Sequence, residues 1–186
     1  FGRYLIGAVV IVPFALYESR KINLIAALRK DKQLAFETFG LGAVMFGGIG
    51  LQQTALLYTN VANAAFLTAL YVPLVPLIAA VFLRRHVPLN IWPAVLLSMA
   101  GSYLLSGTSA LDAQFGDLLI IGGAFFWAGH ILLIQHVLEK IAAPLQLSVY
   151  QSLVTALLAG IVMVPLEAPH PSDFLPVLPQ LAFAGV

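Results

Sequence analysis

The sequence contains no cysteine, and only 9% of its 186 residues are charged. The missing cysteines exclude disulfides, thiolate metal sites and cysteine nucleophiles. The scarcity of charge excludes an ordinary soluble domain, in which roughly a quarter of the residues are charged, and also a disordered chain. A net charge of +1 leaves no basic face for nucleic acid. Because 61% of the residues are hydrophobic, the composition predicts an all-α, polytopic membrane protein.

The usual catalytic motifs are missing as well. The sequence has no HExxH, no GxSxG elbow, no P-loop and no Asp-rich metal motif. The long apolar runs contain no pair of carboxylates, and a nucleophile–base arrangement needs at least two suitable groups within reach. We therefore expect no enzyme, no metal site and no cofactor.

The charged residues divide the chain into apolar runs that predict its membrane spans. A crossing needs ~20 apolar residues. The run 38–83 would extend about 69 Å as one helix at 1.5 Å per residue, far beyond a ~30 Å hydrocarbon core, so it must fold back. The polar break from Thr59 to Asn63 favours the turn there. The predicted complete spans are 38–58, 62–83, 86–111, 118–138 and 141–166, and the runs 4–17 and 174–186 are predicted to be helices cut by the chain ends, so that the chain is a fragment.

The distribution of lysine and arginine predicts the orientation. Eight of the nine basic residues fall on alternate loops, namely 18–37, 84–85 and 139–140, and the positive-inside rule places these loops in the cytoplasm. The first span then runs from outside to inside. The loop 18–37 is long enough for a short surface helix with Ile22, Leu24, Ile25 and Leu28 on the membrane and its lysines facing anionic lipid, although we favour an ordinary cytoplasmic linker.

Polar and aromatic side chains inside the spans are candidates for a substrate cavity, because intramembrane polar groups tend to mark transport pathways. Gln52 and Gln53 point about 100° apart on a helix, so that one can bond a neighbouring helix while the other faces a cavity. Trp127 and His130 share one helix face with Gly123 and Ile134. Packing and internal hydrogen bonds are the alternative roles. The candidate substrate-binding residues are Gln53, Tyr71, Trp127, His130 and Gln151.

Two prolines follow Tyr71 within the third span. Pro73 and Pro76 each lack a backbone donor, and each frees a carbonyl of the preceding turn. We expect them to kink the helix, either as a hinge beside the cavity or as ordinary membrane prolines.

Residues 51–67, which read LQQTALLYTNVANAAFL, resemble the junction between the third and fourth helices of EamA-like transporters in the drug/metabolite transporter superfamily. The segments 71–77, 101–105 and 116–119, together with 124–128, are also similar to that family. The family often has a glutamate after the fourth helix, where this chain has Arg84, Arg85 and His86.

The resemblance implies a ten-helix fold built from two inverted five-helix repeats with both termini in the cytoplasm. The chain would then run from the second into the eighth helix. Residues 1–111 would form most of the first repeat, and residues 112–186 the first part of the second. Sites in such folds lie near the midplane between the repeats.

These observations favour a secondary transporter, a permease or exporter of the cell (inner) membrane that moves a small metabolite, amino acid or drug-like solute by alternating access. The alternatives are a passive channel and a membrane assembly protein that transports nothing. Coupling stays open between His130 as the titrating group, an acid on helices outside the chain, and facilitated transport. The expected partners are a small solute and the lipid bilayer, and the sequence predicts no oligomeric state.

Overall fold

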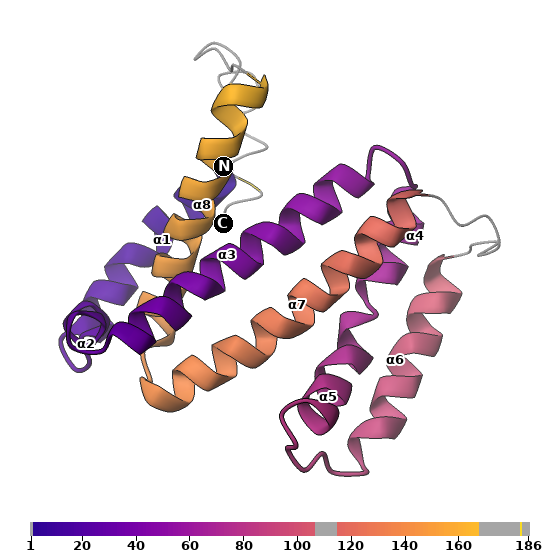
Figure 1. The fold of residues 1–186 in the computed structure, drawn as a ribbon, viewed down its shortest axis with the longest axis horizontal. Coiled ribbons are helices and arrows are strands. Elements are labelled where there is room, and N and C mark those ends of the chain that lie inside the picture. The colour runs from indigo at the N-terminus through magenta and orange to yellow at the C-terminus, as the bar shows by residue number, and fades with distance from the viewer. Residues whose placement is uncertain (1, 107–114, 168–182, 184–186) are drawn as a thin grey trace. The chain divides into compact units, whose positions relative to one another are not determined.

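The computed structural model describes residues 2–106, 115–167 and 183, and within them the regular structure is helical (Figure 1). The chain divides into two compact units. Unit 1 comprises residues 1–46 and 133–186, and unit 2 comprises residues 47–132. Two long helices, α3 (Lys32–Ala55) and α7 (Phe115–Lys140), contribute to both units.

Unit 1 contains α1 (Gly2–Ser19), α2 (Leu24–Lys30), the first part of α3, the last part of α7, and α8 (Pro144–Glu167). Helix α1 packs along α8. The apolar core of this unit joins α2, α3, α7 and α8 through the buried side chains Leu24, Leu34, Leu41, Val137, Ala143 and Leu147.

Helix α2 forms where we favoured an ordinary linker. The Asn23 side chain accepts a hydrogen bond from the backbone N–H of Ala26 at 2.9 Å and so caps the helix. Leu24 is 1% exposed within the core of unit 1, whereas Ile25 is 61% exposed. The segment is therefore docked onto the protein through Leu24, and this packing accounts for a helix too short to be stable alone.

Unit 2 contains the last part of α3, α4 (Val61–Thr68), α5 (Tyr71–Val81), α6 (Ile91–Ser106) and the first part of α7. Helix α6 packs against α4 and α5. A turn at the polar break is confirmed, but it begins earlier than predicted. Helix α3 ends at Ala55, residues 56–60 form the turn, and Asn60 caps α4 by accepting from the N–H of Asn63 at 2.7 Å.

Within the described residues, five helical segments are long and apolar enough to cross a membrane: Gly2–Ser19, Lys32–Ala55, Val61–Val81, Phe115–Lys140 and Pro144–Met163. The chain is therefore a multi-pass membrane protein. The segment 86–111, which we predicted to be a complete crossing, is not among these five, because its apolar helical part, Ile91–Gly101, is shorter than a membrane span. Pro88 has no N–H and disfavours helix in the preceding residue. Residues 107–111, and all of 174–186 except Phe183, lie outside the described residues.

Candidate functional site

Glycines on α3 allow a close approach to the aromatic residues of α7 in unit 2. A Cβ on Gly47 would lie 2.5 Å from Phe126 Cε1, and a Cβ on Gly48 would lie 3.6 Å from the indole Nε1 of Trp127. Gly123 of α7 lies against Gly48 and Leu51 in the same way. Small residues serve this purpose in membrane helices because they let two backbones come close together.

Trp127 and His130 form the most unusual part of this interface. Their ring centroids are 6.0 Å apart with planes at 87°, which is an edge-to-face contact. The His130 side chain is buried, at 6% exposed. The indole Nε1 of Trp127 is also buried, and no described residue accepts a hydrogen bond from it. A buried donor without an acceptor is costly, and in native structures such groups often occur at functional sites.

The two adjacent glutamines have different surroundings. Gln52 donates from Nε2 to Thr68 Oγ1 at 3.2 Å, and Thr68 Oγ1 donates to the Ala64 carbonyl at 2.7 Å. Gln53 is exposed on α3. The bonded and exposed positions thus follow the 100° separation expected on a helix.

The remaining predicted site residues are distributed over both units. Tyr71 is the first residue of α5 in unit 2 and is half-buried. Gln151 lies on α8 in unit 1, where it is also half-buried and makes at least one polar or ring interaction. Among the five candidates, the structure shows a ring contact between Trp127 and His130.

The span that contains the two prolines is interrupted between α4 and α5. Helix α4 ends at Thr68 and α5 begins at Tyr71. Pro73 cannot donate to the carbonyl of Ala69 four residues earlier, and that carbonyl instead accepts from Val72 N at 3.0 Å. Pro76 lies buried inside α5. Ala69 and Leu70 keep helical backbone angles, so that the span continues through one tightened turn.

Asp117 forms a polar cluster that we did not predict, since we expected this acid to lie just outside a span. It belongs to the first turn of α7 and is 7% exposed. Its Oδ1 accepts hydrogen bonds from Thr59 Oγ1 at 2.7 Å and from Asn63 Nδ2 at 2.6 Å. The polar break 59–63 signalled a turn, but only the packing of α7 on that turn shows that it surrounds a carboxylate.

Removing this carboxylate should destabilise unit 2. Asp117→Ala removes the acceptor of the Thr59 hydroxyl and leaves Asn63 Nδ2 only its longer bond, to Thr59 Oγ1 at 3.3 Å. Hydrogen bonds to a charged group are worth about 1.5–3 kcal/mol each. We expect a loss of about 2–4 kcal/mol in the free energy of unfolding, measured in detergent, and a smaller loss in Asp117→Asn, which keeps an acceptor oxygen. Equal stability of Asp117→Ala and the wild type would contradict a structural role for the cluster.

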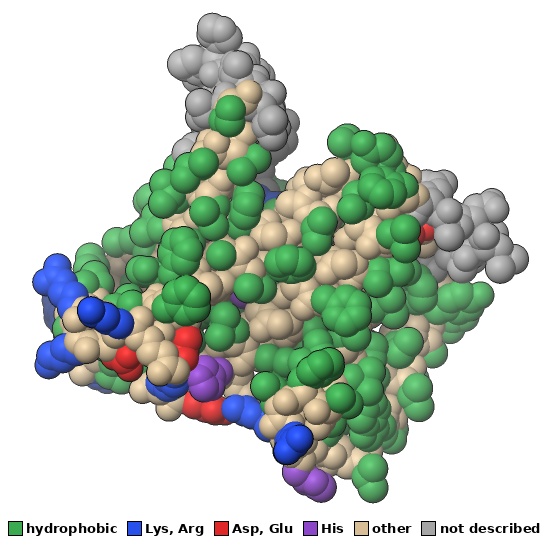
Figure 2. Space-filling view, in the orientation of Figure 1, with side chains coloured by type: hydrophobic (Ala, Val, Ile, Leu, Met, Phe, Trp, Pro, Cys, Tyr) green, Lys and Arg blue, Asp and Glu red, His purple; other side chains and the backbone are tan. Residues whose placement is uncertain are grey.

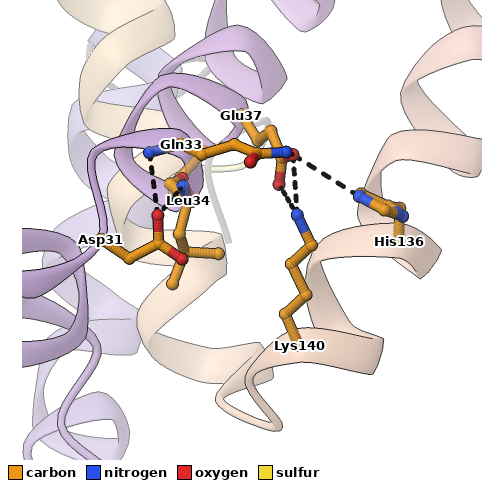
Figure 3. Close-up of polar contacts among 7 residues, drawn as sticks. Asp31, Gln33, Leu34, Glu37, His136 and Lys140 are labelled. Carbon is orange, nitrogen blue, oxygen red and sulfur yellow. Dashed lines mark hydrogen bonds and ion pairs between the residues drawn. The ribbon is translucent and has the colours of Figure 1, made fainter.

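A second polar cluster lies in unit 1, where the start of α3 meets the end of α7 (Figure 3). Both Glu37 carboxylate oxygens accept from Lys140 Nζ at 2.7 Å. His136 Nε2 lies 3.5 Å from Glu37 Oε1, and Gln33 Nε2 donates to the same oxygen at 2.9 Å. Asp31 caps α3 by accepting from the N–H of Leu34. Of these contacts, those of Glu37 with Lys140 and His136 join α3 to α7 within unit 1.

Comparison with known proteins identifies the family. The model of the EamA-like transporter family matches residues 1–107. A protein of Archaeoglobus fulgidus named as an uncharacterized transporter is 34% identical over 127 residues, which cover 66% of this chain and 39% of that protein. The chain thus spans about two fifths of that relative's length. No solved structure matches the chain. Because the family model covers more than half of the sequence, the chain belongs to the EamA-like transporter family.

Proposed function

We propose that this chain is part of a secondary transporter that moves a small metabolite, amino acid or drug-like solute by alternating access. The family is one of transporters and not of enzymes. The observation that carries the proposal is the buried indole N–H of Trp127, which has no acceptor among the described residues and lies beside the buried His130. A solute with a hydrogen-bond acceptor would satisfy this donor, since indole Nε1 can only donate.

The surroundings of Trp127 support a binding role. Phe126 is 40% exposed on the same helix and adds a second aromatic surface. The indole and phenyl faces can stack on a planar or cationic solute. Gly47 and Gly48 have no side chains, so that the rings of Phe126 and Trp127 lie directly against the backbone of α3.

The irregular turn between α4 and α5 supports a moving element. Its two halves meet at Ala69 and Leu70, where the regular helical hydrogen bonding is interrupted because Pro73 has no N–H. We take Pro73 and Pro76 to shape a hinge, since hinges are short segments that absorb changes in backbone angles. Tyr71 at this break, Gln53 and Gln151 complete the proposed substrate-binding set.

The proposed architecture has two inverted repeats that meet near residue 112. Residues 1–111 would supply most of the first repeat and residues 112–186 the beginning of the second. Each repeat would contain five spans, and this odd number inverts the second repeat in the membrane. The proposed location is the cell (inner) membrane, with the loops that carry Arg20, Arg84 and Lys140 in the cytoplasm.

Solute counterflow tests the proposal. The full-length protein would be reconstituted in proteoliposomes preloaded with one unlabelled solute from a panel of amino acids and metabolites, and uptake of the labelled solute would be followed without nucleotide. A transporter gives a transient accumulation of label above equilibrium. Lack of accumulation for every solute would count against transport, and single-channel conductance would identify a pore instead.

His130 provides a separate test of coupling to protons. If its imidazole is the titrating group, the counterflow rate should depend on pH, because histidine is the side chain that most often gains and loses a proton near neutral pH. The pH dependence should disappear in His130→Gln, which keeps polarity but does not titrate, and should persist in the control His136→Gln, whose side chain is 43% exposed. An unchanged profile in His130→Gln would assign coupling to another group.

A further inference from the structure

A groove of about 320 Å³ lies in unit 1 between α1, α2 and α8. Its lining is almost wholly apolar, and includes Val12, Leu16, Leu24, Ile25, Val149 and Leu153. Its volume falls within the range of small-molecule sites, roughly 300–1,000 Å³. Water is a poor occupant because a bound water needs two to four polar partners. An empty groove would forfeit the dispersion contacts of its lining, so an apolar occupant is favoured.

The three helices that form the groove are tied together at one end. The Glu18 carboxylate of α1 accepts from the backbone N–H groups of Leu145 at 3.3 Å and Gln146 at 2.9 Å, at the N-terminus of α8. The Gln146 side chain donates to the Ile22 carbonyl at 2.7 Å and accepts from the N–H of Leu24 at 3.0 Å. The groove is thus preformed, and Glu18 provides acceptors for two backbone N–H groups at the start of α8.

The same end of the groove is basic. Arg20 and Lys21 are exposed and lie in the chain between Ser19 and Asn23, which both line the groove. Neither forms an ion pair with another described residue; the Arg20 guanidinium lies 6.0 Å from the Tyr17 ring. Five of the nine lysines and arginines fall within residues 20–32. Figure 2 shows Lys and Arg side chains gathered where Figure 1 draws α2.

The charge distribution also predicts which lipids meet this end. The positive-inside rule places the loop 18–37 at the cytoplasmic surface, where the leaflet carries anionic phospholipids. We propose that the groove binds an acyl chain of an anionic phospholipid from this leaflet, and that Arg20 and Lys21 bind its phosphate. An acyl chain gains little by moving between two apolar surroundings, so selectivity for this lipid comes from the phosphate contacts.

Photocrosslinking in nanodiscs tests the site. The full-length protein would be placed in phosphatidylcholine with a trace of phosphatidylglycerol that carries a diazirine in its acyl chain, and the labelled residues would be mapped by mass spectrometry. We expect label on α1 and α8 within the groove. Arg20→Gln combined with Lys21→Gln should lower this label roughly 30-fold, because each basic residue near an anionic headgroup contributes about a factor of five.

A second variant fills the groove without changing charge. Val149→Trp should remove the label, whereas Val9→Trp should not, since Val9 is 70% exposed on α1 and is not part of the lining. Arg84→Gln combined with Arg85→Gln is the matched charge control from another cytoplasmic loop. Melting temperatures would identify variants that unfold. If Val149→Trp unfolds, the two charge variants decide the result.

Two outcomes would overturn the proposal. Equal labelling by phosphatidylglycerol and phosphatidylcholine probes, unchanged by Arg20→Gln with Lys21→Gln, would show that no anionic headgroup is recognised. Label that avoids the groove in the folded wild type would show that another part of the protein fills it. Neither outcome depends on the identity of the transported solute.

Discussion

Trp127→Ala is expected to lower the rate of solute counterflow about tenfold or more. The substitution removes the aromatic surface beside His130 and the buried indole donor. In the proposed site the variant loses one hydrogen bond and one aromatic contact to the solute, which together amount to about 1.5–3 kcal/mol. A difference of 1.4 kcal/mol corresponds to a factor of ten. The initial rate of counterflow in proteoliposomes, with equal amounts of reconstituted protein, measures the effect.

Two further variants separate the roles of the indole. Trp127→Phe keeps an aromatic ring but removes the N–H donor, so we expect it to weaken apparent solute affinity while transport continues at saturating solute. Trp92→Ala is the matched control, because Trp92 is the other tryptophan of the chain and lies on α6. If the folded Trp127→Ala variant showed the wild-type rate of counterflow, Trp127 would not be part of the binding site. Equal loss in Trp92→Ala would indicate a general effect on packing.

Gly42→Ala is expected to destabilise unit 1 by about 1–3 kcal/mol, the usual cost of overpacking. A Cβ on Gly42 would lie 2.5 Å from both Cβ and Cγ1 of Val154 on α8, and 3.1 Å from the Gln151 carbonyl. The Val154 atoms stand close to the backbone of their own helix and cannot rotate far away. Thr155 Oγ1 also donates to the Gly42 carbonyl at 3.1 Å, so that a forced separation weakens this bond too. Reversible unfolding in a denaturing detergent measures the loss.

Val154→Ala should partly rescue Gly42→Ala, because it removes Cγ1, one of the two Val154 atoms that would lie 2.5 Å from the new methyl group. The double variant should therefore be more stable than the sum of the single changes predicts, by about 1 kcal/mol or more. Gly50→Ala is the matched control on the same helix, since nothing lies within 4 Å of its Cβ position. Strict additivity, or equal effects at Gly42 and Gly50, would contradict the close contact between α3 and α8.

Much of the fold follows from local properties of the sequence. The polar break at Thr59–Asn63 gave the turn before α4, since an asparagine side chain can cap the helix that it precedes. The contact between Trp127 and His130 could also be predicted, because residues three apart on one helix lie on the same face. Composition alone indicated a membrane protein, since so few side chains favour water.

Local sequence patterns did not predict elements whose stability depends on packing against residues far along the chain. Helix α2 was not favoured over a linker because its stability comes from Leu24, which packs into a core shared with residues more than 100 positions away. The crossing predicted over 86–111 began too early. Helix α6 starts only at Ile91, because Pro88 disfavours helix in this apolar stretch.

The amino-acid sequence by itself determined the membrane class, most of the spans, the turn at Asn60 and the face shared by Trp127 and His130. Tertiary structure alone decided that Gln52 bonds Thr68 while Gln53 is exposed, that the Trp127 donor is buried without an acceptor among the described residues, and that Asp117 lies against Thr59 and Asn63. The physical reason is the range of the interactions. Capping and helical periodicity act within a few residues, whereas burial and hydrogen-bond partners depend on which distant segment packs against each side chain.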